Sequence, residues 1–306
     1  MWYDKRFHSL NYALREHFDC KIIKLSIDGG FTCPNRDGSI AKNGCIFCSE
    51  QGSGEFASSS SLSIENQIEE QISLLSTKWP NAKYIAYFQN FTSTYGSVEY
   101  LKKIYDSALS CNNVVGLAIA TRPDCLSIEV LNLLAEFNKK TFLWIELGLQ
   151  SIHKSSADFI RRGYSLDVFD NAVNNLNERN IKSVVHIISN LPTESKEDYY
   201  STLKYLNKKP IWGVKIHMLH ILKNTDLEKY YLQNPFSLMN QDDYINLIVH
   251  SLEILRPDIV IHRITGDGKK EDLIAPRWTL NKRAVLNGVD KLLKSSDSYQ
   301  GKLYNP

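Results

Sequence analysis

The sequence lacks several features that would assign the chain to a broad class of protein. No run of residues approaches the length of about 20 apolar residues that a membrane-spanning helix needs, and the first residues have no apolar signal core. Neither sign of charge dominates, because 36 basic and 34 acidic residues leave a net charge of +2. That balance is too mild to indicate nucleic-acid binding by itself. We therefore expect a cytoplasmic protein that does not associate with a membrane.

Cysteine is scarce and unevenly distributed. The chain of 306 residues has six cysteines, and Cys33, Cys45 and Cys48 lie together in the segment of residues 29–50. In a reducing cytoplasm, clustered cysteines are typical of metal or redox sites rather than of disulfides. The other three cysteines stand alone among apolar residues, as expected of buried, inert thiols.

Three thiolates are one ligand short of a closed metal site. Thiolates suit zinc or iron–sulfur clusters, and a zinc site needs a fourth Cys or His ligand, usually at a short spacing. Apart from the three clustered cysteines, residues 21–110 contain no His and no Cys, although a distant histidine could still close a zinc site. The pattern therefore favours an iron–sulfur cluster with one open iron over zinc.

Apolar runs alternate with amphipathic segments along the chain. Repeated strand–helix units with nearly continuous apolar strands predict a parallel sheet covered by helices. Six units are fewer than the eight of a closed barrel, so we expect an α/β fold with a partial (β/α)6 TIM-type barrel. The expected strands are residues 22–27, 83–88, 114–120, 141–149, 181–188 and 212–219.

The last part of the chain has a different organisation. Two helical patterns, at residues 241–255 and 279–293, flank a seventh strand-like run at residues 258–264. We expect residues 1–235 to form the barrel and residues 236–306 to form a C-terminal strand and helical extension packed on it. The cysteine segment follows the first strand, where parallel barrels carry their chemistry.

Polar residues interrupt the apolar runs or end them. Glu146 lies within an apolar run, where an unpaired carboxylate is costly to bury. Gln150 lies an even number of residues further along the same strand, and Gln89 ends another strand. We expect these side chains to bind a polar cofactor, although for Glu146 a salt bridge to a nearby Lys or Arg is the alternative. His186, within a third run, could equally be a satisfied core histidine.

Several segments in order resemble the radical S-adenosylmethionine (SAM) superfamily. The cysteine segment, with Phe47 before the last cysteine, resembles the cluster loop, whose usual spacing is Cys-x3-Cys-x2-Cys. The eleven residues between Cys33 and Cys45 depart from that spacing and resemble the YtqA/YhcC-type subgroup, which is related to the radical SAM domain of the Elongator catalytic subunit. Tyr164 departs from the subgroup, where histidine is common. Further segments that resemble subgroup motifs are residues 87–95, 121–124, 146–151, 185–194, 215–217 and 262–268.

The resemblance implies a cofactor-dependent enzyme. Cys33, Cys45 and Cys48 would hold a [4Fe–4S] cluster whose open iron binds the amino and carboxylate groups of SAM. One-electron reduction would then cleave SAM to a 5′-deoxyadenosyl radical that abstracts hydrogen from the substrate, with flavodoxin or ferredoxin as the electron donor. The residues implied to contact SAM are Phe47, Gln89, Glu146, Gln150, Arg162 and His186.

The subgroup also implies a substrate. Its members are linked to tRNA, in which wobble 5-carboxymethylaminomethyl-(2-thio)uridine is converted to the 5-aminomethyl form before a separate methyltransferase acts. The implied partners are therefore the anticodon stem-loop of tRNA and a downstream tRNA methyltransferase. Two alternatives stay open: a radical SAM enzyme that acts on a small molecule, and a zinc-stabilised RNA-binding protein without catalysis. The scattered basic pairs are typical of solvated surface.

Overall fold

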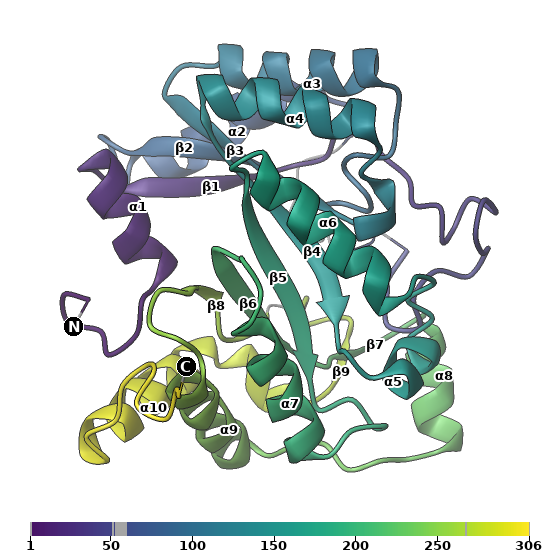
Figure 1. The fold of residues 1–306 in the computed structure, drawn as a ribbon, viewed down its shortest axis with the longest axis vertical. Coiled ribbons are helices and arrows are strands. Elements are labelled where there is room, and N and C mark those ends of the chain that lie inside the picture. Colours follow the sequence, from purple (N-terminus) through teal and green to yellow (C-terminus); the bar gives the residue numbers. More distant parts are fainter. Residues whose placement is uncertain (1, 51, 53–59, 267, 306) are drawn as a thin grey trace.

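A parallel sheet curved into part of a barrel forms the centre of the molecule (Figure 1). The computed structural model describes residues 2–50, 52, 60–266 and 268–305. Within them, one sheet has seven strands in the order β1-β2-β3-β4-β5-β6-β8, each parallel to its neighbours. The strands are β1 (Ile22–Ile27), β2 (Lys83–Phe88), β3 (Val114–Thr121), β4 (Phe142–Gln150), β5 (Lys182–Ser189), β6 (Gly213–Met218) and β8 (Val260–Arg263).

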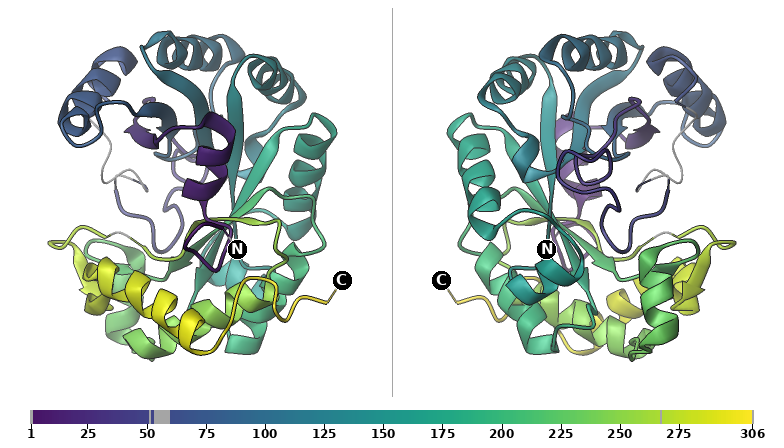
Figure 2. Two further views of the ribbon diagram at one scale, coloured as in Figure 1. Left: turned by 90° about the vertical axis from the view of Figure 1, so that its left-hand side faces the viewer. Right: turned by 90° about the vertical axis from the view of Figure 1, so that its right-hand side faces the viewer.

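Most helices cover the convex face of the sheet, and Figure 2 shows them as an arc outside the strands. Apolar side chains between the sheet and these helices form the largest part of the core. Among the described residues, no helix combines the length and the apolar character needed to cross a membrane. The covering helices are α2 (Ile64–Ser76), α3 (Val98–Ser110), α4 (Ile128–Lys140), α6 (Leu166–Glu178), α7 (Lys196–Leu206), α9 (Gln241–Ile254) and α10 (Lys282–Ser295).

Helix starts follow the capping residues of the sequence. The side chains of Ser63, Ser97 and Ser127 each accept a hydrogen bond from a backbone N–H in the first turn of α2, α3 and α4. Ser195 and Asp198 form a reciprocal capping box at the start of α7. Each such cap satisfies backbone donors that have no partner within the helix, so these residues fix where the covering helices begin.

The concave side of the sheet is closed at one end by α1 (Leu10–Phe18). Leu14 of α1 packs among Ile22, Trp144 and Val184, which point inward from the first halves of their strands. The segment before α1 attaches to β8, because Ile261 N donates a hydrogen bond to the His8 carbonyl at 2.7 Å. This end of the barrel interior is therefore filled, and among the described residues the remaining space lies toward the carboxyl ends of the strands.

The partial barrel expected from the sequence is confirmed, with strand bounds within two residues of the expected ones. The seventh run pairs with β6, so the C-terminal region contributes a strand to the barrel sheet instead of only packing on it. Periodicity did not indicate α1, which buries only Leu14. Other unexpected elements are α5 (Lys154–Phe159), α8 (Asp226–Gln233), the antiparallel pair β7 (Ile221–Leu222) and β9 (Leu273–Ala275), and two short 3-10 turns, Pro123–Cys125 and Arg277–Leu280.

Candidate active site

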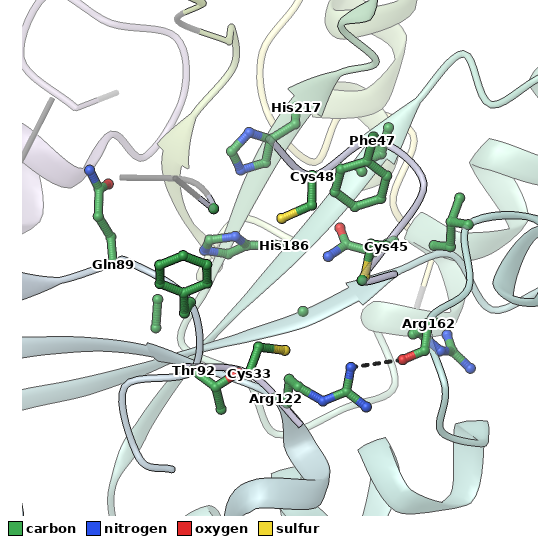
Figure 3. A pocket seen from close by; sticks show the side chains of 18 of the residues that line it. Cys33, Cys45, Phe47, Cys48, Gln89, Thr92, Arg122, Arg162, His186 and His217 are labelled. Carbon is green, nitrogen blue, oxygen red and sulfur yellow. Dashed lines mark hydrogen bonds between the residues drawn. The ribbon is translucent and has the colours of Figure 1, made fainter. Parts of the chain in front are cut away.

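A cavity of about 300 Å³ lies at the carboxyl ends of the strands. This volume is at the lower end of the range of small-molecule sites, and the position is where parallel barrels carry their active sites. The structure brings all the site residues expected from the sequence to this one cavity (Figure 3). They are Cys33, Cys45, Phe47, Cys48, Gln89, Glu146, Gln150, Arg162 and His186.

The long gap between the first two clustered cysteines is folded and supports them. Asn35, which is buried, donates one amide hydrogen to Cys45 Sγ at 3.6 Å and the other to the Arg161 carbonyl at 2.7 Å. The Arg36 guanidinium donates to the Cys48 carbonyl at 2.9 Å. The gap therefore supplies side chains that hold two of the three cysteines in place.

The three clustered cysteines face one space in the cavity. Within the described ranges, no group of three or more His, Cys, Asp or Glu is arranged to hold a single metal ion. A [4Fe–4S] cluster needs a different arrangement, because each thiolate binds its own iron and the sulfurs stay apart. Figure 3 shows Cys33, Cys45 and Cys48 around one space, as a cluster requires. Burial raises the pKa of Cys45 to about 12, so iron binding would have to displace its proton.

The end of β4 is held by side chains from the segment that follows α5. Arg162 Nη1 donates to the carbonyls of Leu149 and Ser151, at 2.9 and 2.7 Å. Tyr164 donates its hydroxyl hydrogen to the Gly148 carbonyl. Although Arg162 lines the cavity, its hydrogen bonds go to backbone, so the structure gives it a supporting role at β4. Its direct contact with a cofactor stays a prediction.

Below the cavity lies a group of buried charges centred on the carboxylate of Glu146, which is 1% exposed. Oε2 has three hydrogen-bond partners, one of them Lys215, and Oε1 accepts one hydrogen bond from Trp144. The contact with Lys215 confirms the salt-bridge interpretation of Glu146 and leaves direct cofactor binding as a prediction. Burial alone would raise the pKa of Glu146, but the neighbouring cations hold it well below its usual value. Its partners are Tyr87 Oη at 2.8 Å, Trp144 Nε1 at 3.0 Å, His186 Nε2 at 2.7 Å, Lys215 Nζ at 2.9 Å and Lys24 Nζ at 3.8 Å.

Two histidines line the wall above Glu146. Burial, reinforced by Lys215, lowers the pKa of His186 to about 4, so its ring is neutral and donates through Nε2 to Glu146. The His217 ring lies 5.1 Å from it, and its Nε2 is buried with no hydrogen-bond partner in the described part of the chain. Such an unpaired nitrogen beside a cavity lined with polar groups fits a polar ligand such as SAM.

Sequence reasoning missed Lys24 and Asn35. Lys24 occupies the inward face of β1 between the apolar residues Ile23 and Leu25, and this break in an otherwise apolar run was an available signal. The partner of Asn35 is a sulfur that becomes its neighbour only when the loop folds. No local pattern could have indicated that contact.

The basic pairs of the sequence do not converge on the cavity. Lys139 and Lys140 end α4 just before β4, and Lys208 and Lys209 precede β6. Segments that lead into parallel strands lie at the amino-terminal edge of the sheet, which is opposite the cavity. Only other pairs, such as Arg161 and Arg162, lie on the cavity side. The pairs therefore form no single basic surface.

Comparison with known sequences gives an extended match. A profile of the radical SAM superfamily matches residues 37–206, and one of the radical SAM C-terminal domain matches residues 211–295. Uncharacterized protein YtqA of Bacillus subtilis is 44% identical over 301 residues, which cover 98% of this chain and 94% of that protein. Protein YhcC of Escherichia coli is 32% identical over 281 residues, with 92% and 90% covered.

More distant similarity extends to enzymes named for tRNA. The tRNA uridine(34) acetyltransferase of Methanocaldococcus infernus is 25% identical over 174 residues, which are 56% of this chain and 32% of that enzyme. The solved structure of Methanocaldococcus infernus Elp3 superposes with a TM-score of 0.68 at 17% identity. It covers 91% of this chain, which spans 64% of that structure, and at this identity the likeness shows the fold alone.

Proposed function

The chain belongs to the YtqA/YhcC-type subgroup of the radical SAM superfamily, and from this we propose that it is a tRNA-modifying enzyme that acts on wobble uridine. Enzymes of this superfamily use a [4Fe–4S] cluster and SAM, and they need an electron donor. A cluster held by Cys33, Cys45 and Cys48 would supply the electron for reductive cleavage of SAM, and so the radical that removes hydrogen from the substrate. The proposed conversion is of 5-carboxymethylaminomethyl-(2-thio)uridine to 5-aminomethyl-(2-thio)uridine.

The residues of the cavity have distinct proposed tasks. Cys33, Cys45 and Cys48 hold the cluster at the mouth of the barrel. Gln89 and Gln150 offer amide groups to SAM, and Phe47 and His186 add an apolar and a polar contact; all four line the cavity. Glu146 and Arg162 also line the cavity and are proposed to contact SAM, in addition to the hydrogen bonds that Glu146 makes with Lys215 and Arg162 with backbone at the end of β4.

The observation that carries the choice of substrate is the similarity, over 56% of this chain, to an enzyme named for tRNA uridine 34. A second distant relative is Elongator complex protein 3 of Schizosaccharomyces pombe, which is 23% identical over 60% of this chain. The architecture is compatible with such a substrate, since an unstacked base in a single-stranded loop can reach a cavity at the end of a barrel.

The proposed reaction balances without a net electron. The nitrogen–carbon bond of the carboxymethylamino group breaks, and its methylene carbon leaves as the aldehyde carbon of glyoxylate, oxidised by two electrons. Water supplies the aldehyde oxygen, and SAM accepts the two electrons and one proton to become methionine and 5′-deoxyadenosine. The other proton is released to solvent. The electron that the donor supplies to start the cycle would therefore be returned to the protein's electron carrier when the substrate radical is oxidised.

The proposed reaction also requires an electron donor and has consequences for the next enzyme and for the location of the protein. Flavodoxin or ferredoxin is the proposed electron donor. The aminomethyl product carries a free amine, which a downstream tRNA methyltransferase would accept. We also propose a cytoplasmic location, where the enzyme would meet its tRNA substrate.

Mass spectrometry of tRNA nucleosides from a strain that lacks the gene tests the proposal. The carboxymethylaminomethyl nucleoside should accumulate and the aminomethyl form should disappear. Wild-type protein, purified anaerobically, should restore the product in vitro and release glyoxylate and 5′-deoxyadenosine in equal amounts. Unchanged tRNA in the deletion strain, together with SAM cleavage that tRNA does not stimulate, would reject this substrate in favour of a small molecule.

A further inference from the structure

Cys45 receives a hydrogen bond from a side chain of its own loop. Asn35 is 1% exposed, and its Nδ2 lies 3.6 Å from Cys45 Sγ and 2.7 Å from the Arg161 carbonyl oxygen. A carbonyl only accepts hydrogen bonds, so the amide nitrogen of Asn35, and not its oxygen, must face Arg161. The second hydrogen of the same nitrogen is then available to the sulfur. A backbone group therefore sets the orientation of the amide, independently of the cysteine.

Backbone hydrogen bonds hold Asn35 beside Cys45. Gly44 N donates to the Asn35 carbonyl at 2.7 Å, and Ile46 N donates to the Ile160 carbonyl at 3.2 Å. The residues on either side of Cys45 are therefore both anchored, one to Asn35 itself and the other to the turn that ends α5. An N–H donor that is already held in place loses little side-chain entropy when it pairs with the sulfur. The contact is thus built into the folded loop.

A hydrogen bond to a thiolate ligand changes the relative energies of the redox states of an iron–sulfur cluster. Hydrogen bonds to the sulfurs are among the features that set the reduction potential of such a cluster. Reduction adds negative charge, part of which lies on the sulfurs, so an N–H donor stabilises the reduced form more than the oxidised form. The effect is larger in a buried site than in water. A buried amide at Cys45 Sγ therefore raises the potential.

We propose that Asn35 is a positioning residue that acts through Cys45 to raise the reduction potential of a cluster held by Cys33, Cys45 and Cys48. The inference rests on the proposed cluster, and not on the choice of tRNA as the substrate. It gives the eleven residues between Cys33 and Cys45 a task, because they carry the N–H donor and fold it back onto the second cysteine. The electron donor can then reduce the cluster at a less negative potential.

A redox titration of the cluster, followed by electron paramagnetic resonance, tests this role without substrate or turnover. Asn35→Leu keeps the approximate size of the side chain and removes the N–H donor. In protein purified anaerobically, at equal iron content and without SAM, the ratio of reduced to oxidised cluster at a fixed potential should fall about tenfold, the scale of one hydrogen bond. For a one-electron couple this fall is a shift of about 59 mV toward more negative potential.

Asn43→Leu is the matched control. It makes the same substitution at an exposed residue of the same gap, whose side chain forms no hydrogen bond within the described part of the chain. Its potential should equal that of the wild type. A second measurement uses wild-type protein labelled with side-chain ¹⁵N-asparagine, in which pulsed electron paramagnetic resonance of the reduced cluster should detect coupling to an amide nitrogen.

The sign of the shift separates this role from a loss of structure. If Asn35→Leu only loosened the loop, water would reach the cluster, stabilise its more negatively charged reduced form and raise the potential. An unchanged or raised potential at full iron content would overturn the inference and leave the cluster assignment intact. If the variant cannot hold iron, the labelled wild-type protein decides, because absence of the ¹⁵N coupling would also overturn it. Wild-type protein that assembles no cluster would reject the proposed function as well.

Discussion

The inward-facing side chains differ between the first and second halves of the barrel strands, although the backbone is a continuous parallel sheet. In the first half, Phe142, Trp144 and Trp212 pack ring against ring, with centroids 5.6–5.9 Å apart, and α1 closes that end. In the second half, charged and polar side chains surround a cavity. The boundary is sharp, because Trp144 and Glu146 are successive inward residues of β4 and share a hydrogen bond of 3.0 Å.

The two halves therefore contribute differently to the free energy of folding. The aromatic half and the convex face bury apolar surface, which is the dominant favourable term in folding. The charged half instead desolvates ions, and their mutual attraction offsets that cost only when every partner is present. We therefore expect removal of a charge in the second half to affect chemistry or stability strongly, and replacement of a buried histidine by a similar apolar ring in the first half to have a small, pH-dependent effect.

The largest expected effect comes from the cysteine loop. Cys45→Ala should remove a cluster ligand, so the protein purified anaerobically should lose its brown colour and most of its iron, and SAM cleavage should fall to background. Iron analysis and 5′-deoxyadenosine formation measure both. Cys111→Ala is the matched control, since this thiol lies at the end of α3 away from the cavity. A Cys45→Ala protein with full iron content and full SAM cleavage would contradict the cluster assignment.

The next effect concerns the buried charges. Glu146→Gln leaves Lys215 and Lys24 without their carboxylate, and loss of one partner of a buried ion pair should lower the free energy of unfolding by about 3–5 kcal/mol. Tyr87→Phe keeps the ring, removes only the hydroxyl that bonds Glu146 and Lys215, and should cost roughly 1–2 kcal/mol. Urea unfolding of both variants against wild type, at matched iron content, measures the difference. Equal effects of the two substitutions would mean that Glu146 is not the centre of the group.

The smallest effect should appear at His262 in the aromatic half. Burial lowers its pKa well below the ordinary value, and both ring nitrogens lack hydrogen-bond partners among the described residues. A histidine with a depressed folded pKa contributes stability above its unfolded pKa of about 6.5 and loses it as the pH falls. His262→Phe should remove this loss, so its stability relative to wild type should rise by about 1.4 kcal/mol between about pH 7.5 and pH 5.5.

Unfolding midpoints of wild type and His262→Phe at the two pH values test this sign. The other buried histidines are present in both proteins, so their titration cancels from the comparison. A variant whose relative stability is the same at both pH values would show that His262 can be protonated in the folded chain.

Sequence predicted the strands of this fold well, because each is a short apolar run bounded by turns or helix starts. It predicted less where local pattern is weak: α1 buries a single leucine, and α5 has only six residues, too few to show periodicity. The pairing of β8 with β6 was also beyond sequence reasoning, because register depends on contacts between distant segments.

The site shows the same limit at the level of side chains. The cysteines and the polar residues at strand ends could be located in the sequence. Clustered thiols indicate a metal site, and a polar group in apolar surroundings is costly to bury without a partner. The partners of Glu146 could not be identified, because Lys24 and Lys215 lie on two other strands, far from it in sequence. The backbone carbonyls that Arg162 bonds could not be identified either, and its contact with a cofactor stays a prediction.

The contacts that hold the segment before α1 can form only late in protein synthesis. Arg6 pairs with Asp297 at 2.7 Å, and His8 N donates to Gln300 Oε1 at 2.8 Å, a partner 292 residues later in the chain. At ribosomal speeds that interval corresponds to roughly 15–60 s. The aromatic half of the barrel interior therefore stays incompletely closed through most of translation, and its apolar surface needs shielding from other chains until the last turns emerge.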